Sequence, residues 1–374
     1  MLRYLTSGES HGKALLTILD GIPSGLRIDE AKVNRELCRR MLGYGRGRRM
    51  RIEADRVKVL SGLRKAVTIG SPIALMVDNV DHSIDRLPAV LCPRPGHADL
   101  AGAMKYDLND IRSVLERASA RETAARVTVG AVCKALLMEF GIEIASHVVV
   151  IGGVEAEIKD LGFKRLVSIA EKSPVRCADP AASKLMCAEI EDAMGEGDTL
   201  GGVFEIIVRG APAGLGSYTQ YDRRIEGRLA AAVMSIQAVR GISFGVGFEA
   251  ARLRGSMVHD EIFYDRKRGF YRTTNNAGGI EGGMTTGEAI VMHAVMKPIA
   301  TLMKPLSSVN IKTKKAVRAS IERADICAVP AAGVVGEAVV AIELAGAMIE
   351  KFGGDSIREM RRNYDGYMEQ IRKF

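Results

Sequence analysis

The amino-acid sequence predicts an α+β protein built from two related halves, each combining several strands with one long, alanine-rich helix. Short apolar stretches bounded by Gly, Pro or Asp are typical of strands. Five such stretches are Leu15–Leu19, Val57–Leu60, Ile73–Val77, His147–Ile151 and Val203–Val208. Between them, apolar residues recur every three or four positions, as they do along one face of a helix. This order favours two sheets that either sandwich helices or are covered by them.

Two of the expected helices are long. Arg117–Phe140 stops at Gly141, and Pro330–Phe352 begins with a proline that a first turn tolerates and ends at a Gly-Gly pair. Shorter helices are expected at Asp29–Leu42, Pro180–Met194, Arg223–Gln237 and Ser356–Arg372. Neither a short-period repeat nor a Pro/Ser-rich linker separates the halves, so residues 1–374 are expected to form a single domain.

The composition is that of a compact globular enzyme with an aliphatic core. Hydrophobic residues make up 47% of the chain, while aromatic residues make up 5% and Trp is absent. The chain has no run of about 18 uncharged apolar residues and no signal-peptide pattern, so a cytoplasmic location without a membrane is expected. The six cysteines form no C-x-x-C pair and the histidines lack ligand-like spacing, so no metal site is expected.

The net charge of +8 favours an anionic partner. The densest basic run, residues 46–51, lies among glycines and lacks the interleaved aromatic residues of a base-stacking surface. A metabolite that carries phosphate or carboxylate groups is therefore favoured over a nucleic acid. A basic RNA-binding loop remains the alternative interpretation of this run.

The first candidate site is the segment Gly8–Gly12, GESHG, which follows an apolar start. Glycines on both sides allow a sharp turn that exposes His11, and a histidine can exchange a proton near neutral pH. A nucleophile–base pair of Ser10 with His11 is disfavoured, because adjacent residues of an extended segment point to opposite faces. A turn with a capping serine and an ordinary histidine explains the segment equally well.

The second candidate is the glycine- and arginine-rich segment Gly43–Met50, which follows Arg40. Its G-x-G-x-G spacing after a helix is neither a dinucleotide fingerprint nor a P-loop. The guanidinium groups of Arg46, Arg48 and Arg49 can each bind a carboxylate or phosphate with two hydrogen bonds. A solvated basic loop is the competing interpretation.

The third candidate is RPGHAD, residues 94–99, where prolines stiffen a turn that presents His97. A structural or merely exposed histidine is the alternative. A fourth candidate is the segment 111–123, in which Arg117 and Arg121 share a helical face near Ser119 and could bind an anion together with the backbone. An ordinary salt-bridge network with the glutamates of this segment is equally compatible.

The C-terminal half contains further glycine-rich and polar segments. They are SIQAVRG at 235–241, NNAGGIEGGMTTG at 275–287, KPIAT at 297–301 and RADICAVP at 323–330. Their glycines suit a close backbone approach to a planar or phosphorylated ligand, although loop flexibility alone also explains them. Arg323 and Asp325 place a cation and a carboxylate just ahead of the last long apolar helix.

Taken in order, these segments resemble the chorismate synthase family across nearly the whole chain. The seven motifs are GESHG, GYGRGRRM, RPGHADL, RASARET, SIQAVRG, NNAGGIEGGMTTGE and RADICAVP. The resemblance implies a β-α-β sandwich with long central helices, assembled as a homotetramer. It also implies a carbon–oxygen lyase that uses reduced FMN to eliminate phosphate from 5-enolpyruvylshikimate 3-phosphate. This anti-1,4 elimination gives chorismate, in the last common step of the shikimate pathway to aromatic amino acids.

The resemblance assigns roles to the residues that match the motifs. His11 matches the histidine that protonates the flavin near N1, His97 the one that protonates or stabilises the departing phosphate, and Asp325 the carboxylate that manages the proton at flavin N5. The FMN-contacting positions correspond to Arg117, Ala118, Ser119, Gln237, Ala238, Gly282, Lys297, Pro298, Ile299, Ala300, Thr301 and Arg323. Ala118 stands where the family commonly has a serine, so only backbone donors remain at that position.

The clamps for the substrate's phosphate and carboxylates correspond to Arg40, Arg46, Arg48, Arg49 and Arg121, of which the first two also match positions assigned to NADPH. The sequence leaves open whether the enzyme reduces its own FMN with NADPH or relies on a separate flavin reductase. The strongest alternative enzyme is a flavin oxidoreductase with net hydride transfer. The strongest alternative outside the enzymes is a basic nucleic-acid-binding protein.

Overall fold

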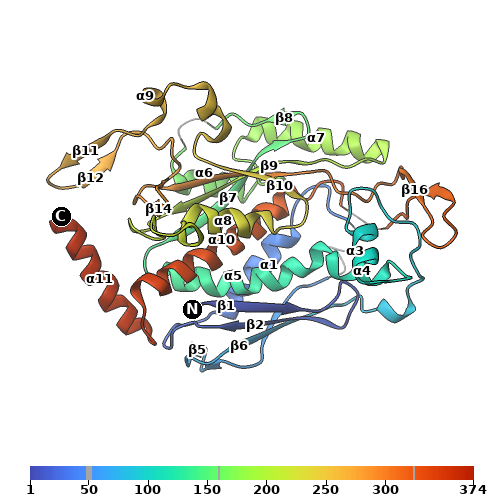
Figure 1. Ribbon diagram of the computed structural model, residues 1–374, viewed down its shortest axis with the longest axis horizontal. Helices are drawn as coiled ribbons and strands as arrows, with labels where there is room; N and C mark the ends of the chain where they lie inside the picture. The colour runs from blue at the N-terminus through green and yellow to red at the C-terminus, as the bar shows by residue number, and fades with distance from the viewer. Residues whose placement is uncertain (48–52, 159–160, 323–324) are drawn as a thin grey trace.

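The computed structural model describes residues 1–47, 53–158, 161–322 and 325–374, which form layers of sheet, helix and sheet (Figure 1). The first sheet is antiparallel and joins, in this order, β1 (Arg3–Ser7), β2 (Ala14–Asp20), β6 (Ile73–Asp78) and β3 (Val57–Val59). The second sheet is also antiparallel and joins β10 (Val239–Phe244), β15 (Ile290–Met296), β9 (Gly202–Arg209), β7 (Glu143–Ile151) and β8 (Val154–Glu155). The predicted α+β fold and the β-α-β sandwich are confirmed.

The layer between the sheets is helical. It contains α1 (Glu30–Met41), α5 (Thr123–Met138), α8 (Ile225–Met234) and α10 (Val329–Phe352). Helix α5 packs on the first sheet, α10 packs on the second, and the two helices pack along each other. Two further helices, α6 (Phe163–Ala170) and α7 (Pro180–Glu196), pack against the β7–β8 side of the second sheet, and α11 (Ile357–Lys373) packs against α10.

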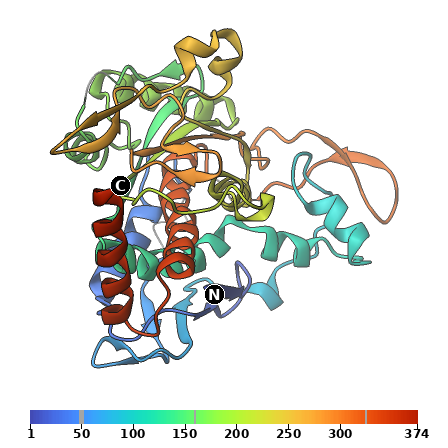
Figure 2. The same cartoon turned by 60° about the vertical axis from the view of Figure 1, so that its left-hand side comes forward.

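Smaller elements complete the described chain. They are the hairpins β4–β5 (Leu63–Arg64, Val67–Thr68), β11–β12 (Ile262–Asp265, Gly269–Arg272), β13–β14 (Ile280–Glu281, Met284–Thr285) and β16–β17 (Ser307–Val309, Ala316–Arg318), and the helices α3 (Asp99–Lys105), α4 (Arg112–Ala118) and α9 (Gly255–Val258). Short 3₁₀ helices lie at η1 (Ile84–Arg86), η2 (Ala120–Glu122), η3 (Tyr221–Arg223) and η4 (Gly247–Arg252). In Figure 2 the orange β16–β17 hairpin projects together with α3 and α4, away from the three layers.

The helix predicted at Arg117–Phe140 is in fact three pieces, α4, η2 and α5. Ser119 has an extended backbone, with φ −64° and ψ 142°, and its side chain accepts a hydrogen bond from the backbone N–H of Arg121. A serine cap of this kind offers the backbone an alternative to continuous helix. The prediction was wrong here because a 3.6-residue apolar period does not report a local side-chain cap.

Small residues bring α5 and α10 close together. A Cβ atom added to Gly130 of α5 would fall 2.4 Å from the Cβ of Ala338, so only glycine permits this approach. Helix α10 alone in the described chain is long and apolar enough to cross a membrane, yet most of it is buried inside the protein. A helix that is apolar on all sides is expected at the centre of a layered fold.

Glu337 introduces a charge into the middle of this apolar helix, and its side chain is completely buried. Its carboxylate accepts hydrogen bonds from Arg39 of α1 at 2.7 and 2.9 Å, and from Lys134 of α5 at 2.6 Å. It also accepts from Ser146 of β7 at 2.6 Å and from Arg176 at 3.2 Å. Burial alone would raise the pKa of Glu337, but Arg39, Lys134 and Arg176 hold it well below its usual range. One carboxylate thus ties three helices to the second sheet.

We predict that Glu337→Ala lowers the free energy of unfolding by about 3–5 kcal/mol, because Arg39 and Lys134 lose the buried carboxylate that they share. Glu350→Ala on the same helix is the control, since Glu350 is half exposed and pairs with Arg228 at the rim, where such pairs contribute about 0–1 kcal/mol. Urea unfolding at pH 7 measures both changes, and equal losses would contradict the account. The folded-state pKa is depressed, so this contribution should be present above the unfolded pKa of about 4.3 and disappear as the pH falls.

Candidate active site

Polar loops from distant parts of the sequence meet at one end of the helical layer. The backbone N–H of Ser10, in the β1–β2 loop, donates to the carbonyl of Glu116 in α4 at 3.0 Å. The N–H of Ile326, just before α10, donates to the carbonyl of Gly45 after α1 at 2.8 Å. The first contact joins the first and fourth candidate segments, and the second joins the glycine- and arginine-rich segment to the segment that precedes the last long helix.

His11 is held by a buried carboxylate. Its ring Nδ1 lies 2.9 Å from Glu116 Oε1, and its backbone N–H donates to Glu116 Oε2 at 2.7 Å. Burial would raise the pKa of Glu116, but the contacts with His11, and with Arg112 at 3.7 Å, lower it. An ionised carboxylate at Nδ1 favours the ring form with a proton on that nitrogen. Nε2 is the atom on the other edge of the ring, 3.9 Å from Asp81.

His97 is held in the same way by Asp99. Nδ1 of His97 lies 2.5 Å from Asp99 Oδ1, and Arg94 donates to the same carboxylate at 2.8 and 3.0 Å. Burial would raise the pKa of Asp99, but the hydrogen bonds from His97 and Arg94 hold it well below its usual range. Arg94 also donates to Thr301 Oγ1 at 2.7 Å, which fixes the His97 turn to the loop that follows β15.

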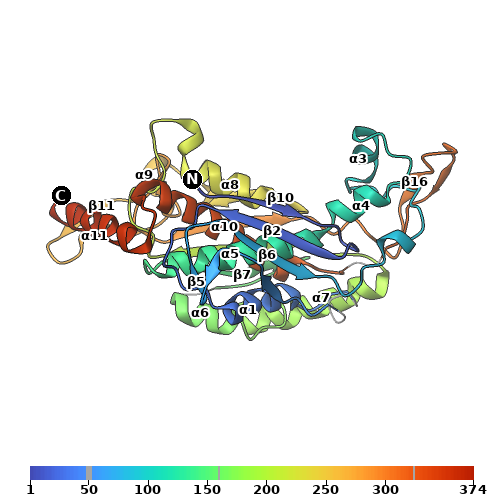
Figure 3. The same cartoon turned by 90° about the horizontal axis from the view of Figure 1, so that it is seen from below.

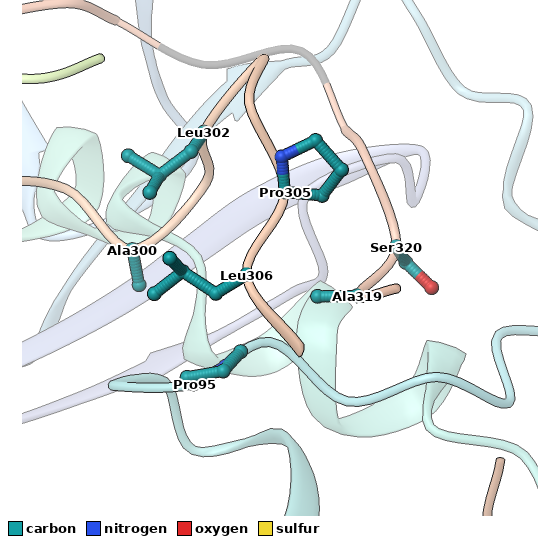
Figure 4. A pocket seen from close by; sticks show the side chains of 7 residues that line it. All are labelled: Pro95, Ala300, Leu302, Pro305, Leu306, Ala319 and Ser320. Atoms are coloured by element: carbon teal, nitrogen blue, oxygen red, sulfur yellow. The ribbon is translucent and has the colours of Figure 1, made fainter. Parts of the chain in front are cut away.

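An apolar hollow lies under this junction (Figure 4). It is lined by Pro95, Ala300, Leu302, Pro305, Leu306, Ala319 and Ser320, and is too narrow to admit a water molecule. The side chains shown in Figure 4 come from the His97 turn, from the loop between β15 and β16, and from the residues after β17, so the hollow is a packing contact among these three segments. It supports the position of His97 and offers no room for a ligand.

Arg40 and Arg121 are buried and share one carboxylate. Arg40 donates to Asp55 Oδ2 at 2.8 Å, and Arg121 donates to Asp55 Oδ1 at 2.5 Å and to Asn79 at 2.8 Å. Burial would raise the pKa of Asp55, and the two arginines lower it. The pKa of Arg40 is lowered by burial, with further contributions from the charges of Arg121 and Arg46. The three guanidinium groups therefore form a cationic cluster that internal carboxylates partly neutralise.

Arg46 pairs with Asp325. The Nη1 atom of Arg46 lies 2.8 Å from Asp325 Oδ2, and the backbone N–H of Gly47 donates to Asp325 Oδ1 at 2.7 Å. Gly45 has a φ of +79°, and a Cβ there would fall 2.7 Å from Ile190, so the loop needs glycine to reach this position. Arg48, Arg49 and Arg323 lie outside the described residues.

Most of the predicted FMN-binding residues that the structure describes lie on linked loops, and Gly282 lies apart from them. Arg117 donates to the carbonyls of Thr6 and Gly8 at 3.1 and 3.2 Å, and Ser119 donates to Ser10 at 3.2 Å. The segment 297–301 links the His97 turn to the residues that follow α8. The Nζ of Lys297 donates to the carbonyl of Gly96 at 2.9 Å, and the backbone N–H of Lys297 donates to the carbonyl of Ala238. Pro298, Ile299 and Ala300 complete the segment, and Ala118 ends α4.

Gln237 and Ala238 follow the C-terminal end of α8. The Nε2 of Gln237 donates to Glu122 at 3.3 Å, while its Oε1 is buried without a partner among the described residues. Gly282 lies in the β13–β14 turn, and the N–H of Ile225 at the start of α8 donates to the neighbouring Gly283. Because α8 has 10 residues, it is about 15 Å long, and it separates Gly282 from the Gln237 end.

Comparison with known proteins gives a consistent result. A family model described as chorismate synthase matches residues 2–349. The chain is 55% identical to the chorismate synthase of Geobacter metallireducens and 54% identical to that of Geobacter sulfurreducens, and both alignments cover 100% of each protein. A solved structure described as a crystal structure of chorismate synthase is 44% identical, has a TM-score of 0.83, and is matched over 99% of its length by the whole of this chain. The chain belongs to the chorismate synthase family. The family predicted from the seven motifs is confirmed.

Sequence reasoning about this family member placed Asp99 beside His97 but missed Glu116 as the group that holds His11. Glu116 was considered only as part of a salt-bridge network, and Arg94 and Asp55 were not considered as site residues. The proximity of Asp99 to His97 in sequence is a usable signal for that pair. Asp55 carries no such signal, because its partners Arg40 and Arg121 are 15 and 66 residues away.

We predict that Glu116→Ala allows the His11 ring to exchange between its two neutral forms, whereas the unaltered protein keeps the proton on Nδ1. Nitrogen-15 NMR of the imidazole measures the two forms directly. Glu322→Ala is the matched control, because it also removes a carboxylate partner of Arg112, at 3.0 Å, without touching His11. An unchanged ring form in Glu116→Ala would show that this carboxylate does not orient the histidine.

Proposed function

We propose that the protein is a carbon–oxygen lyase that converts 5-enolpyruvylshikimate 3-phosphate and reduced FMN to chorismate, phosphate and unchanged reduced FMN. The observation that carries this proposal is the 55% identity to a chorismate synthase over the full length of both proteins. Two histidines held by buried carboxylates, and arginines that gather on Asp55, support it. In the reaction the C3–O bond of the substrate breaks, a hydrogen leaves C6, and no net oxidation occurs. The anionic substrate, with two carboxylates and a phosphate, matches a site that is rich in arginine.

The residues at the Gln237 end of α8 fit a flavin. The buried, unpartnered Oε1 of Gln237 is an acceptor for a ring N–H group, and Arg117, Ser119 and Lys297 supply donors for a phosphate. Bound reduced FMN would supply electron density for C–O cleavage and take it back with the C6 hydrogen. The neighbouring residues Ala118, Ala238, Pro298, Ile299, Ala300 and Thr301 would line this site, with Gly282 and Arg323 as further contacts.

The chain's own groups would manage protons and charge. His11, held through its Nδ1 proton by Glu116, would exchange a proton with flavin N1 through Nε2, and His97 would donate to the departing phosphate oxygen. Asp325 would accept the proton at flavin N5 once Arg46 turns from this carboxylate to the substrate. Arg40, Arg48, Arg49 and Arg121 would neutralise the substrate's anionic groups, which favours cleavage by stabilising the developing phosphate charge.

The proposal includes finer points that rest on the family resemblance. The protein would act in the cytoplasm as a homotetramer of single-domain chains spanning residues 1–374. Arg40 and Arg46 would also contact NADPH if the enzyme reduces its own FMN. Otherwise a separate flavin reductase would supply the reduced cofactor.

Anaerobic incubation with 5-enolpyruvylshikimate 3-phosphate and chemically reduced FMN tests the proposal. The expected result is chorismate with one phosphate released per product and a flavin that ends reduced. Net oxidation of the flavin would favour a flavin oxidoreductase instead. No product from well-folded protein would overturn the proposal, and binding to nucleic acid that persists at high salt would favour the nucleic-acid-binding alternative.

We predict that His11→Ala and His97→Ala each lower kcat by about 10- to 10⁴-fold, the range for losing a positioned proton donor or acceptor. FMN binding and the melting temperature should change little, because both rings are partly exposed. His82→Ala is the control, since His82 is exposed and, among the described residues, its side chain hydrogen-bonds only to the nearby carbonyl of Val80. Wild-type turnover in either test variant would remove that histidine from the mechanism.

We predict that Asp325→Asn binds substrate and reduced FMN nearly normally yet turns over at least about tenfold more slowly. The amide keeps the shape and can still accept from the Gly47 N–H, but it cannot take a proton. Asp198→Asn is the control, because within the part of the chain that the structure describes the Asp198 side chain accepts only from the adjacent Thr199 N–H. Single-turnover kinetics with separate binding measurements decide the matter, and an unchanged rate would make Asp325 a structural residue.

A further inference from the structure

One buried carboxylate links three elements beside the proposed flavin site. Glu122 of η2 is 7% exposed. Its carboxylate accepts a hydrogen bond from Thr6 Oγ1 of β1 at 3.0 Å, and from Gln237 Nε2, just beyond α8, at 3.3 Å. The Nε of Arg126 in α5 donates to both of its oxygens at 3.0 Å. Figure 3, seen from below, shows β1, α5 and α8, the elements on or beside which these partners of Glu122 lie.

The carboxylate decides which way the amide of Gln237 faces. An amide has an NH₂ group that donates hydrogen bonds and a carbonyl oxygen that accepts them, whereas an ionised carboxylate only accepts. The NH₂ group is therefore the side that faces Glu122. Gln237 Oε1 is left on the other side, buried and without a partner among the described residues. A buried acceptor of this kind costs free energy until a donor meets it.

The backbone at this point is fixed as well. Ala238 has a φ of +66°, in the left-handed region that residues with a Cβ atom rarely adopt. Its carbonyl accepts from the backbone N–H of Lys297 at 2.9 Å. Such a conformation persists only where the surrounding structure holds it. The direction of Gln237 Oε1 is thus set by the contact with Glu122 on one side and by a held backbone on the other.

Glu122 also connects two of the predicted FMN contacts. The hydroxyl of Thr6 donates to Glu122 and accepts from Arg117 Nη2 at 3.0 Å. Hydrogen bonds therefore run without a break from Arg117 through Thr6 and Glu122 to Gln237. The alternative is that Glu122 only forms an ion pair with Arg126, four residues along the chain, and so stabilises the start of α5.

We propose that Glu122 is a positioning residue for the flavin, because it turns the Gln237 amide so that Oε1 accepts the hydrogen bond of the ring N3–H group. The inference rests on the proposed function, in which His11 serves flavin N1 and Asp325 serves flavin N5. N3–H is the ring N–H group that remains, and both the oxidised and the reduced ring carry it. Glu122 acts through Gln237 and does not touch the flavin.

Fluorescence titration of the full chain with FMN and with FMN methylated at N3 tests the inference, in the presence of 5-enolpyruvylshikimate 3-phosphate. Both flavins are oxidised, so no turnover disturbs the titration. The unaltered protein should bind FMN about 5- to 100-fold more tightly than the methylated form, which has no N3–H to donate.

Glu122→Gln is the test variant. The new amide can donate to Gln237, which allows the Gln237 amide to turn over and face the flavin with its NH₂ group. The ratio of the two affinities should then fall toward one, mainly through weaker binding of FMN. Glu343→Gln is the matched control, because it makes the same change in a partly buried glutamate that pairs with Arg228. It should keep the ratio of the unaltered protein.

The exchange variant Glu122→Gln with Gln237→Glu separates positioning from general stability. A carboxylate at position 237 is an acceptor whichever way it turns, and the amide at 122 can donate to it, so most of the FMN affinity should return. A folded exchange variant that keeps the weakened affinity would overturn the inference.

A lower melting temperature in Glu122→Gln with an unchanged affinity ratio would also overturn it, since that is the result for an ion pair that only stabilises α5. If such a protein still makes chorismate, the proposed function stands and only the role of Glu122 is wrong. Unaltered protein that binds neither flavin and makes no chorismate would overturn both.

Discussion

Glu337 sits at the middle of the central helix α10 with no exposed surface, and three cations and a serine converge on its carboxylate. Arg39 and Arg176 also share Glu171, and Lys134 also contacts Glu36, so the cluster contains three cations and three carboxylates. A buried charge is tolerated only when it is paired and hydrogen-bonded, and each charged group here has at least one partner of opposite charge within 3.2 Å. The elements that carry these residues can therefore pack in one arrangement and not in a shifted one.

The buried cluster also positions the candidate active site, because Arg39 of the cluster and Arg40 of the site are adjacent residues in the last turn of α1. Arg39 donates a hydrogen bond to Glu337, and Arg40 donates one to Asp55. The glycine-rich loop with Arg46 begins only a few residues later and docks on Asp325 ahead of α10. The hydrogen bonds that fix α1 to α10 thus also set where these arginines stand. Both sheets and the helices between them contribute to the end of the molecule where His11 and His97 lie.

Local sequence signals predicted much of this architecture. Helices α1 and α7 begin within one residue of their predicted starts, and the strands of both sheets follow short apolar runs. The motifs also located His11 and His97. Helix boundaries depend on neighbouring residues, and strands and helices repeat their apolar residues every two or 3.6 positions. A single sequence contains both kinds of signal.

Long-range pairing could not be predicted in this way. A lone glutamate in an alanine-rich helix gives no sign that Arg39, 298 residues away, will meet it. The sequence likewise gave Arg121 as an anion clamp, while the structure has it buried against Asp55 and Asn79, so its role toward substrate remains a prediction. The outward leucine and isoleucine of β2 look like core residues in sequence, and only the layered arrangement reveals that their face is open.

A double-mutant cycle between Arg39 and Glu337 tests most directly whether the buried cluster holds the layers together. Arg39→Met, Glu337→Leu and the double variant are unfolded in urea and compared with the unaltered protein. If the charges act as one unit, the two single changes are not additive, and the double variant is more stable than their sum by about 1–3 kcal/mol. Additivity within about 0.5 kcal/mol would mean that Arg39 and Glu337 contribute independently, and would contradict the account.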